Sequence, residues 1–404
     1  MTAPESPPLT RGRVDTRPPS ETAGAGPTPG PGRIRPLARR WLSRGAVPAL
    51  VFAGSRLATV GLIGVLAKVQ GLSVMRLLRY WDSQWYLTVA QYGYPHTISQ
   101  ATGNAGQSAL GFFPALPLVI RCVHLVTGLG YDGSGVAAAA VAGLVGAIVL
   151  WRLLAELEPG GATRGTALVL LSPASFVLSM VYGEGLLIAA VSGCLLALRR
   201  RHWLVAGLCG AVASATDPLG MAIVAVCVVA AVVALRRDRD FWSVLAPAVA
   251  AAGIGAFCVY LWVHTGTPFA WFETQRHGWQ QGGFGAGVVS VFDAVLLHWP
   301  GGINALVKAA GTIVFVGLLV AWWRWPGKRP DPLVATYVLG VAVLALLSPV
   351  IALSPRVLLR AFPLLGVLGA RLSRRAAVVA CTMSALAMVG LTVASLALSA
   401  SLTP

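Results

Sequence analysis

Residues 218–235 read PLGMAIVAVCVVAAVVAL, a run without a charged side chain, and Arg236 and Arg237 follow it at once. A helix needs about 20 mostly apolar residues to cross the hydrocarbon core of a membrane. Lys and Arg are enriched in the short loops that stay in the cytoplasm. The stretch is therefore typical of a transmembrane helix that ends at the cytoplasmic surface.

The composition of the whole chain agrees with this stretch. Of its 404 residues, 56% are hydrophobic and 11% are charged, whereas soluble domains carry roughly 25% charged residues. This excludes soluble enzyme folds, disordered scaffolds and nucleic-acid binders, although a net charge of +17 would otherwise suggest a polyanionic partner. We predict an all-α polytopic membrane protein.

Apolar runs divide the chain into twelve segments. We predict helices near residues 46–67, 111–127, 133–152, 164–182, 185–198, 203–217, 218–235, 241–264, 302–325, 332–350, 356–371 and 376–400. Residues 1–44, rich in Pro, Gly, Thr and Arg, cannot bury enough apolar surface to fold. They are predicted to form a disordered cytoplasmic tail before a transmembrane domain at 45–404. Two long intervals, 68–110 and 265–301, carry aromatic and polar residues typical of membrane interfaces.

Basic residues between the segments set their orientation. They cluster at Arg199 to Arg201, at Arg236, Arg237 and Arg239, at Arg324, Lys328 and Arg329, and at Arg371, Arg374 and Arg375. With the Arg-rich tail in the cytoplasm, the first helix carries 68–110 to the outer face, and 265–301 shares that face.

Strict alternation would leave Arg199 outside, so one segment must fail to cross. Segment 164–182 is interrupted by Ser172-Pro173, and proline breaks a helix where buried neighbours can satisfy the freed backbone. We predict that this segment is re-entrant from the outer face. Eleven crossings remain, and Arg152 and Arg164 lie outside as exceptions.

Acidic residues at membrane level are costly, so those that are present are candidates for function. Asp82 has the most informative setting, in Arg79-Tyr80-Trp81-Asp82-Ser83-Gln84-Trp85-Tyr86. A carboxylate held among aromatic rings beside a cation can act as a general base. The alternative is an interfacial aromatic belt with Asp82 as a helix cap.

This octapeptide, followed by GFFPALP at 111–117, resembles the signature of the glycosylphosphatidylinositol mannosyltransferase 2 family (PIG-V-like), membrane glycosyltransferases of the GT-C class. Two later blocks extend the resemblance over about residues 45–375: Pro173-Ala174-Ser175 with Ser179, Tyr182 and Glu184, then Ser354-Pro355-Arg356 with Phe362-Pro363. One block departs from the family. Thr216-Asp217-Pro218 stands where relatives carry a basic or polar residue followed by a small polar one.

The resemblance implies a GT-C glycosyltransferase-like fold and transfer of mannose from a polyprenyl-phosphate donor. The acceptor would be a lipid-linked glycan or a secreted protein at the outer face. Inverting transfer needs only one carboxylate, which takes the proton of the acceptor hydroxyl, because no covalent intermediate forms. We predict that Asp82 is this base.

The leaving lipid phosphate needs fixed cations near the membrane surface. The predicted donor- and substrate-binding residues are Arg79, Trp81, Ser83, Tyr86, Tyr182, Glu184, Arg276, His277, Arg356 and Arg360. Glu184 is predicted either to bind an arginine or an acceptor hydroxyl, or to cap a helix. Asp217, next to Pro218, is equally compatible with a helix cap.

We predict no metal and no cofactor. The interval 68–110 contains a single acidic residue, whereas hard cations need several oxygen ligands. Two cations remain to be explained, because Arg56 and Arg121 lie inside predicted helices and need partners or a water-filled groove. Arg121 fits phosphate binding or pairing with Asp132.

Residues 271–283 alternate rings, amides and charges, which fits a sugar site or an interfacial re-entrant helix. The competing function is a transporter or flippase of a lipid-linked sugar, but the inverted repeats of transporters are not evident. A third alternative is an inactive assembly subunit. Arg outnumbers Lys 28 to 3, which favours a GC-rich bacterial source. We predict a multi-pass protein of the bacterial plasma membrane, and the orientation set by the basic loops turns its active site outward.

Overall fold

The computed structural model describes the backbone of residues 34–279, 288–289, 303–347 and 353–397. Within these ranges the regular structure is helical and no strand occurs, which confirms an all-α polytopic membrane protein. Met1–Ser43 form a unit separate from Arg44–Pro404, and the description below concerns the second unit. The predicted disordered tail falls mostly on residues outside the described ranges.

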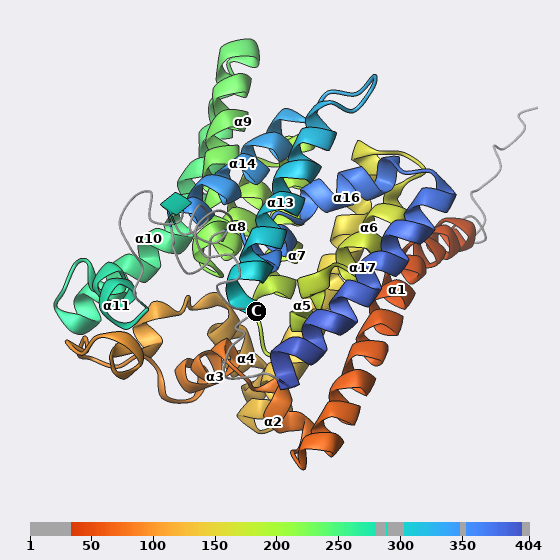
Figure 1. Ribbon diagram of the computed structural model, residues 1–404. Helices are drawn as coiled ribbons and strands as arrows, with labels where there is room; N and C mark the ends of the chain where they lie inside the picture. Colours follow the sequence, from red (N-terminus) through yellow and green to blue (C-terminus); the bar gives the residue numbers. More distant parts are fainter. Residues whose placement is uncertain (1–33, 280–287, 290–302, 348–352, 398–404) are drawn as a thin grey trace, which may run out of the picture. The chain divides into compact units, whose positions relative to one another are not determined.

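Most predicted segments correspond to helices (Figure 1). The α-helices are α1 (Ile34–Gln70), α2 (Val74–Leu78), α3 (Asp82–Tyr92), α4 (Ala115–Thr127), α5 (Tyr131–Leu157), α6 (Ala162–Leu170), α7 (Glu184–Arg199), α8 (Trp203–Ser214), α9 (Ala222–Asp238), α10 (Leu245–Thr265), α11 (Ala270–Gly278), α13 (Ile303–Trp323), α14 (Pro332–Leu346), α15 (Pro355–Arg360), α16 (Phe362–Arg371) and α17 (Arg374–Ala397). Short 3-10 helices are η1 (Gly103–Gly106), η2 (Ala109–Gly111), η3 (Pro173–Ser179), η4 (Pro218–Met221) and η5 (Phe241–Val244).

By length and composition, six helical stretches of the described chain are able to cross a membrane. They are Gly45–Gln70, Tyr131–Leu157, Pro218–Asp238, Phe241–Thr265, Leu306–Trp323 and Arg374–Ala397, and η3 with α7, bent by 103°, adds a seventh if the pair is one span. The prediction of eleven crossings exceeds this number. The difference lies in short apolar helices such as α8, whose 12 residues extend only about 18 Å along a core about 30 Å thick.

Ion pairs show which helix termini share one end of the bundle. At the end of α5, Glu158 meets Arg371 at 2.7 Å and Lys328 at 2.5 Å. At the end of α7, Arg199 meets Asp331 at 2.5 Å. We call this end, which gathers residues 156–164, 199–203, 238–240, 324–332 and 371–375, the basic end.

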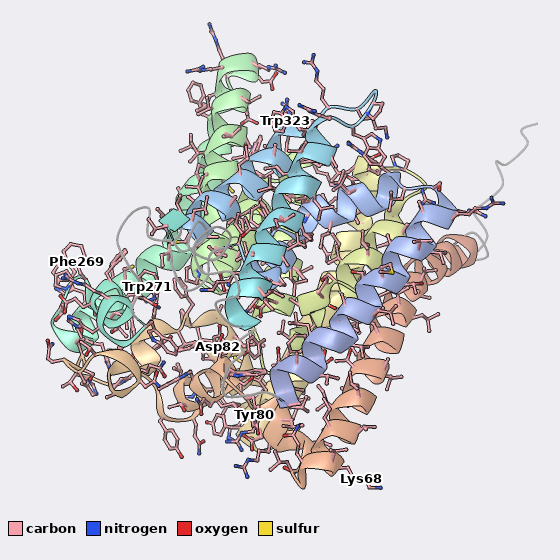
Figure 2. All side chains as sticks on the ribbon, viewed as in Figure 1. Lys68, Tyr80, Asp82, Phe269, Trp271 and Trp323 are labelled. Atoms are coloured by element: carbon pink, nitrogen blue, oxygen red, sulfur yellow. The ribbon has the colours of Figure 1, made fainter. Side chains whose placement is uncertain are left out.

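The opposite end, called the Asp82 end, contains α2, α3, α4 and the first residues of α5 and α7. Here Arg79 meets Asp132 at 2.6 Å, and the Ala115 N–H donates to the Ala215 carbonyl at 2.9 Å. Figure 2 shows Lys68 and Tyr80 toward this end and Trp323 toward the other.

The predicted direction of segment 164–182 is wrong. The α5 helix runs from the Asp82 end to the basic end, so α6 starts at the basic end, where Arg164 donates to the Ala370 carbonyl at 3.0 Å. Segment 164–182 then leads back to the Asp82 end, and Arg152 and Arg164 are no longer exceptions. The segment that stays at one end is α4, since its first residue bonds Ala215 and His124 near its C-terminus stacks on Tyr131 at 4.2 Å.

The predicted break at Ser172-Pro173 is present between α6 and η3. Arg56, 8% exposed on α1, satisfies the freed carbonyls: its Nη2 donates to Leu170 at 2.8 Å and its Nη1 to Ser175. A buried guanidinium needs such acceptors, because the membrane interior offers no water. Arg56 therefore finds its partners in the broken backbone rather than in an acid.

A glycine contact brings α16 against α6. A Cβ added at Gly165 would lie 2.2 Å from the carbonyl oxygen of Gly366, so only glycine permits this approach. Since α15 precedes α16 directly, the contact also determines where the side chains of α15 lie.

The two predicted outer intervals pack on each other at the Asp82 end (Figure 1). Trp279 meets Trp85 edge to face at 5.9 Å, and a Cβ added at Gly278 of α11 would lie 2.3 Å from the carbonyl oxygen of Gly106. Of the second interval, residues 280–287 and 290–301 lie outside the described ranges.

Candidate active site

Asp82 is the first residue of α3 and not its cap. The N-cap residue is Trp81, whose φ of 54° turns the chain sharply, and Trp81 makes no capping side-chain bond. The Asp82 amide donates to the Tyr182 hydroxyl at 3.3 Å. The carboxylate is 25% exposed, so it remains reachable from outside the protein.

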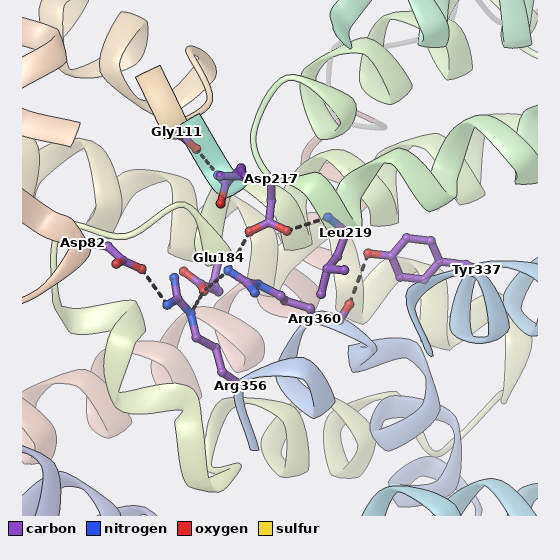
Figure 3. Close-up of polar contacts among 9 residues, drawn as sticks. Asp82, Gly111, Glu184, Asp217, Leu219, Tyr337, Arg356 and Arg360 are labelled. Atoms are coloured by element: carbon purple, nitrogen blue, oxygen red, sulfur yellow. Dashed lines mark hydrogen bonds and ion pairs between the residues drawn. The ribbon is translucent and has the colours of Figure 1, made fainter. Parts of the chain in front are cut away.

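Arg356 joins Asp82 to Glu184 (Figure 3). Its Nη1 lies 2.6 Å from Oδ2 of Asp82, and its Nε lies 2.5 Å from Oε1 of Glu184. The guanidinium carbon stands 4.6 Å from the centroid of the Tyr182 ring, a cation–π arrangement. Arg356 is therefore held from three directions while Asp82 stays at the more exposed edge.

Arg360 extends the chain of charges inward. Its Nη2 lies 3.4 Å from Oε1 of Glu184 and 2.6 Å from Oδ2 of Asp217. The carbonyl of Arg360 accepts a hydrogen bond from the Tyr337 hydroxyl at 3.1 Å. Asp82, Arg356, Glu184, Arg360 and Asp217 together form what we call the Asp82 network.

Local sequence explains how the network assembles. Asp82, Glu184 and Asp217 stand at the N-termini of α3, α7 and η4, where the helix dipole favours negative charge. Arg356 and Arg360 are four residues apart on α15, so they project from one face. Three helix starts thus converge on one short basic helix.

The network holds three carboxylates and two guanidinium groups, a formal charge of −1. Within the described chain, Nε of Arg360 and Oε2 of Glu184 are buried without a hydrogen-bond partner. Buried polar groups are normally paired, so the network keeps donor and acceptor capacity for a further polar group.

Tyr86 and Ser83 lie behind Asp82. Tyr86 is buried and meets Phe112 edge to face at 5.2 Å. Burial raises the pKa of the Tyr86 phenol above its usual value, and the charges of Asp82 and Glu184 raise it further, so Tyr86 is a neutral donor and not a base. Ser83 is fully buried, and its hydroxyl has no partner in the described chain.

Three predicted site residues lie apart from the network. Arg79 meets Asp132, with both side chains well exposed, and therefore does not pair with Asp82. Arg276 is exposed on α11, and His277 is partly buried. Among the described residues, no hydrogen bond or ion pair joins either of them to the network.

Sequence reasoning undervalued Asp217. Its Oδ1 accepts the Leu219 amide at 2.8 Å, which is a cap, while its Oδ2 binds Arg360. The signal in the sequence was that Thr216-Asp217-Pro218 differs from the block that the resembled family carries at this position. Arg121, which was considered as a partner for Asp132, is exposed, and Arg79 occupies that position.

In the described ranges, no three His, Cys, Asp or Glu side chains gather as a metal ion would require. The carboxylates of the network face arginines instead. Arg356 and Arg360 supply positive charge at this site.

Comparisons with known proteins give two solved structures similar to this chain. ArnT from Cupriavidus metallidurans bound to undecaprenyl phosphate has a TM-score of 0.48 and 20% identity, covering 79% of this chain. The same protein in the apo state has a TM-score of 0.47 and 20% identity, covering 82%. The chain matches 60% of the length of each of these structures. No family model and no curated protein matches the chain.

Proposed function

We propose that this protein is an inverting membrane mannosyltransferase that uses a polyprenyl-phosphate-mannose donor. The acceptor is a lipid-linked glycan or a secreted protein, and the Asp82 end faces outward from the plasma membrane. The proposal rests on one observation above all: a partly exposed carboxylate, Asp82, is paired with a nearly buried arginine, Arg356, which is 11% exposed. A base and a cation for a leaving phosphate thus lie side by side.

In the proposed reaction the acceptor hydroxyl oxygen attacks the anomeric carbon from the face opposite the phosphate. Asp82 takes the hydroxyl proton, the bond between the anomeric carbon and the phosphate oxygen breaks, and its electron pair leaves with the lipid phosphate. Arg356 and Arg360 stabilise the charge that develops there. Nε of Arg360 is a buried donor without a protein partner in the described chain, so it is suited to this oxygen.

The ion pair also suggests how donor binding prepares the base. A donor phosphate that attracts Arg356 competes with Asp82 for Nη1, which is 2.6 Å from the carboxylate. As that ion pair weakens, Oδ2 of Asp82 is released to accept the proton of the acceptor hydroxyl. The 2.5 Å contact with Glu184 holds Nε of Arg356 in place meanwhile.

The test is Asp82→Asn, which keeps the size of the side chain and removes its basicity. Membranes containing the full chain are incubated with radiolabelled polyprenyl-phosphate mannose, and labelled lipids and proteins are identified. We expect a loss of transfer of roughly 10²-fold or more. Asp238→Asn, at the exposed Arg201 pair of the basic end, is the control and should transfer normally.

Two outcomes contradict the proposal. If Asp82→Asn retains full transfer, Asp82 is not the base. If the labelled donor crosses the membrane without sugar transfer in either form, the protein is a flippase. A parallel incubation with polyprenyl-phosphate glucose tests whether mannose is the sugar.

A further inference from the structure

A second polar site lies at the basic end, away from the Asp82 network. An open cavity of about 410 Å³ is lined there by the ends of α5, α7, α13, α14 and α16. Its wall includes Leu157, Trp322 and Val367 as well as charged side chains. We call it the basic-end cavity, and nothing in the proposed sugar transfer uses it.

Positive charge is in excess in this cavity. Four cations line it, Arg199, Lys328, Arg329 and Arg371, against two carboxylates, Glu158 and Asp331, which leaves a formal charge of +2. Glu158 is shared by Arg371 and Lys328, and Asp331 is taken by Arg199. Arg329 is exposed and has no ion pair in the described chain.

Two residues that line the cavity each carry a buried donor with no acceptor in the described chain. The Arg371 side chain is 5% exposed, and while its Nε donates to Glu158, its Nη1 is buried without a partner. Trp322 is fully buried, and its indole Nε1 also has no partner. Leaving buried donors unpaired is costly, so the wall is suited to a ligand that only accepts hydrogen bonds.

We propose that the basic-end cavity binds the phosphate group of an anionic phospholipid from the leaflet that surrounds this end. A phosphate supplies several acceptor oxygens and the negative charge that the cavity lacks. Further arginines near the cavity, among them Arg200 and Arg324, attract acidic lipids to this surface, and basic pockets between transmembrane helices bind their head groups. Leu157 and Val367 offer apolar contacts to the glycerol and the first chain carbons.

Arg329→Gln tests the charge component without disturbing any pair in the described chain. Binding of fluorescent phosphatidylglycerol to the purified full chain in phosphatidylcholine nanodiscs should weaken by about fivefold. Arg375→Gln is the matched control, because it removes an exposed cation at the same end that does not line the cavity. Equal losses in both variants would assign the effect to general surface charge and overturn the proposal.

Trp322→Phe tests the buried donor, since it removes the indole N–H and keeps an aromatic ring. We expect phosphatidylglycerol affinity to fall by about tenfold, and unchanged affinity would overturn the proposal. Inorganic phosphate and glycerol phosphate are added as competitors. Displacement of the lipid by either at the lipid's own concentration would overturn the lipid assignment in favour of a soluble phosphate site.

Discussion

Arg360 and Asp217 form a buried ion pair of the Asp82 network, with Nη2 and Oδ2 2.6 Å apart and each side chain 8% exposed. The pair links the turn after α8 to α15, so two segments far apart in sequence are joined by one contact. Removing one partner of a buried pair leaves the other charge buried without a counter-ion. In an exposed pair such as Arg201 with Asp238, whose side chains are 57% and 40% exposed, water solvates the remaining charge.

Asp217→Asn should lower the free energy of unfolding by about 3 kcal/mol. The asparagine oxygen can still accept the Leu219 amide, so the loss reports the ion pair and not the cap. Denaturant titration in detergent micelles measures the change. Asp238→Asn should cost less than about 1 kcal/mol, and equal costs would show that burial does not set the strength of these pairs.

Arg356→Lys should lower kcat/KM for the polyprenyl-phosphate donor by about tenfold or more. Lysine keeps the charge but cannot bond Asp82 and Glu184 with two fixed donors, because it lacks the planar fork of arginine. Initial rates at varied donor concentration measure the effect. Arg79→Lys, at the exposed pair with Asp132, is the comparison, and a larger loss there would place the donor phosphate at Arg79.

Arg56→Met should destabilise the protein by about 3 kcal/mol, because the carbonyls of Leu170 and Ser175 each lose a donor inside the membrane, and Leu170 keeps the Ser175 hydroxyl at 2.7 Å. Thermal unfolding in detergent measures the loss. The exposed Arg121→Met, on α4, should change stability by less than about 0.5 kcal/mol. Similar behaviour of the two variants would mean that Arg56 does not support the helix break.

Gly165→Ala should lower stability by about 2 kcal/mol, because the added Cβ would stand 2.2 Å from the Gly366 carbonyl oxygen and force α6 from α16. Gly61→Ala, where nothing lies within 4 Å of the added Cβ, should be neutral or slightly stabilising. Unfolding transitions of the two variants provide the comparison. If Gly165→Ala unfolds at the same point as the unmodified protein, α6 and α16 can move apart without a loss of stability.

Much of the helical layout could be predicted from the chain alone, since long uncharged runs and the arginines after them are local properties. The break at Ser172-Pro173 was also predictable, because proline acts on its own neighbourhood. The direction of segment 164–182 was not. It depended on whether α4 crosses, and that is decided by the contact of Ala115 with Ala215, one hundred residues apart in the chain.

The candidate site was predictable in part. Asp82, Glu184 and Arg356 were named from their motifs and Arg360 as a cation close to the third motif, and the structure brings them together. Arg276 and His277 were named because they are basic residues in a polar interval. Their charge does not tell how far they lie from Asp82 in the folded chain. Asp217 was missed as a network member because a cap and an ion-pair partner have the same local sequence.

The order of residues along the chain was enough to show a membrane protein built of helices, to locate most of those helices, and to mark Asp82 and two arginines as candidates for chemistry. These conclusions follow from hydropathy and short motifs, which act over one or two turns. The folded chain was needed to show that Arg356 bridges Asp82 and Glu184, that Arg360 binds Asp217, and that Arg56 binds the backbone at the helix break. Each of these contacts joins residues more than one hundred positions apart, and such pairings are set by how the helices pack and not by any local pattern.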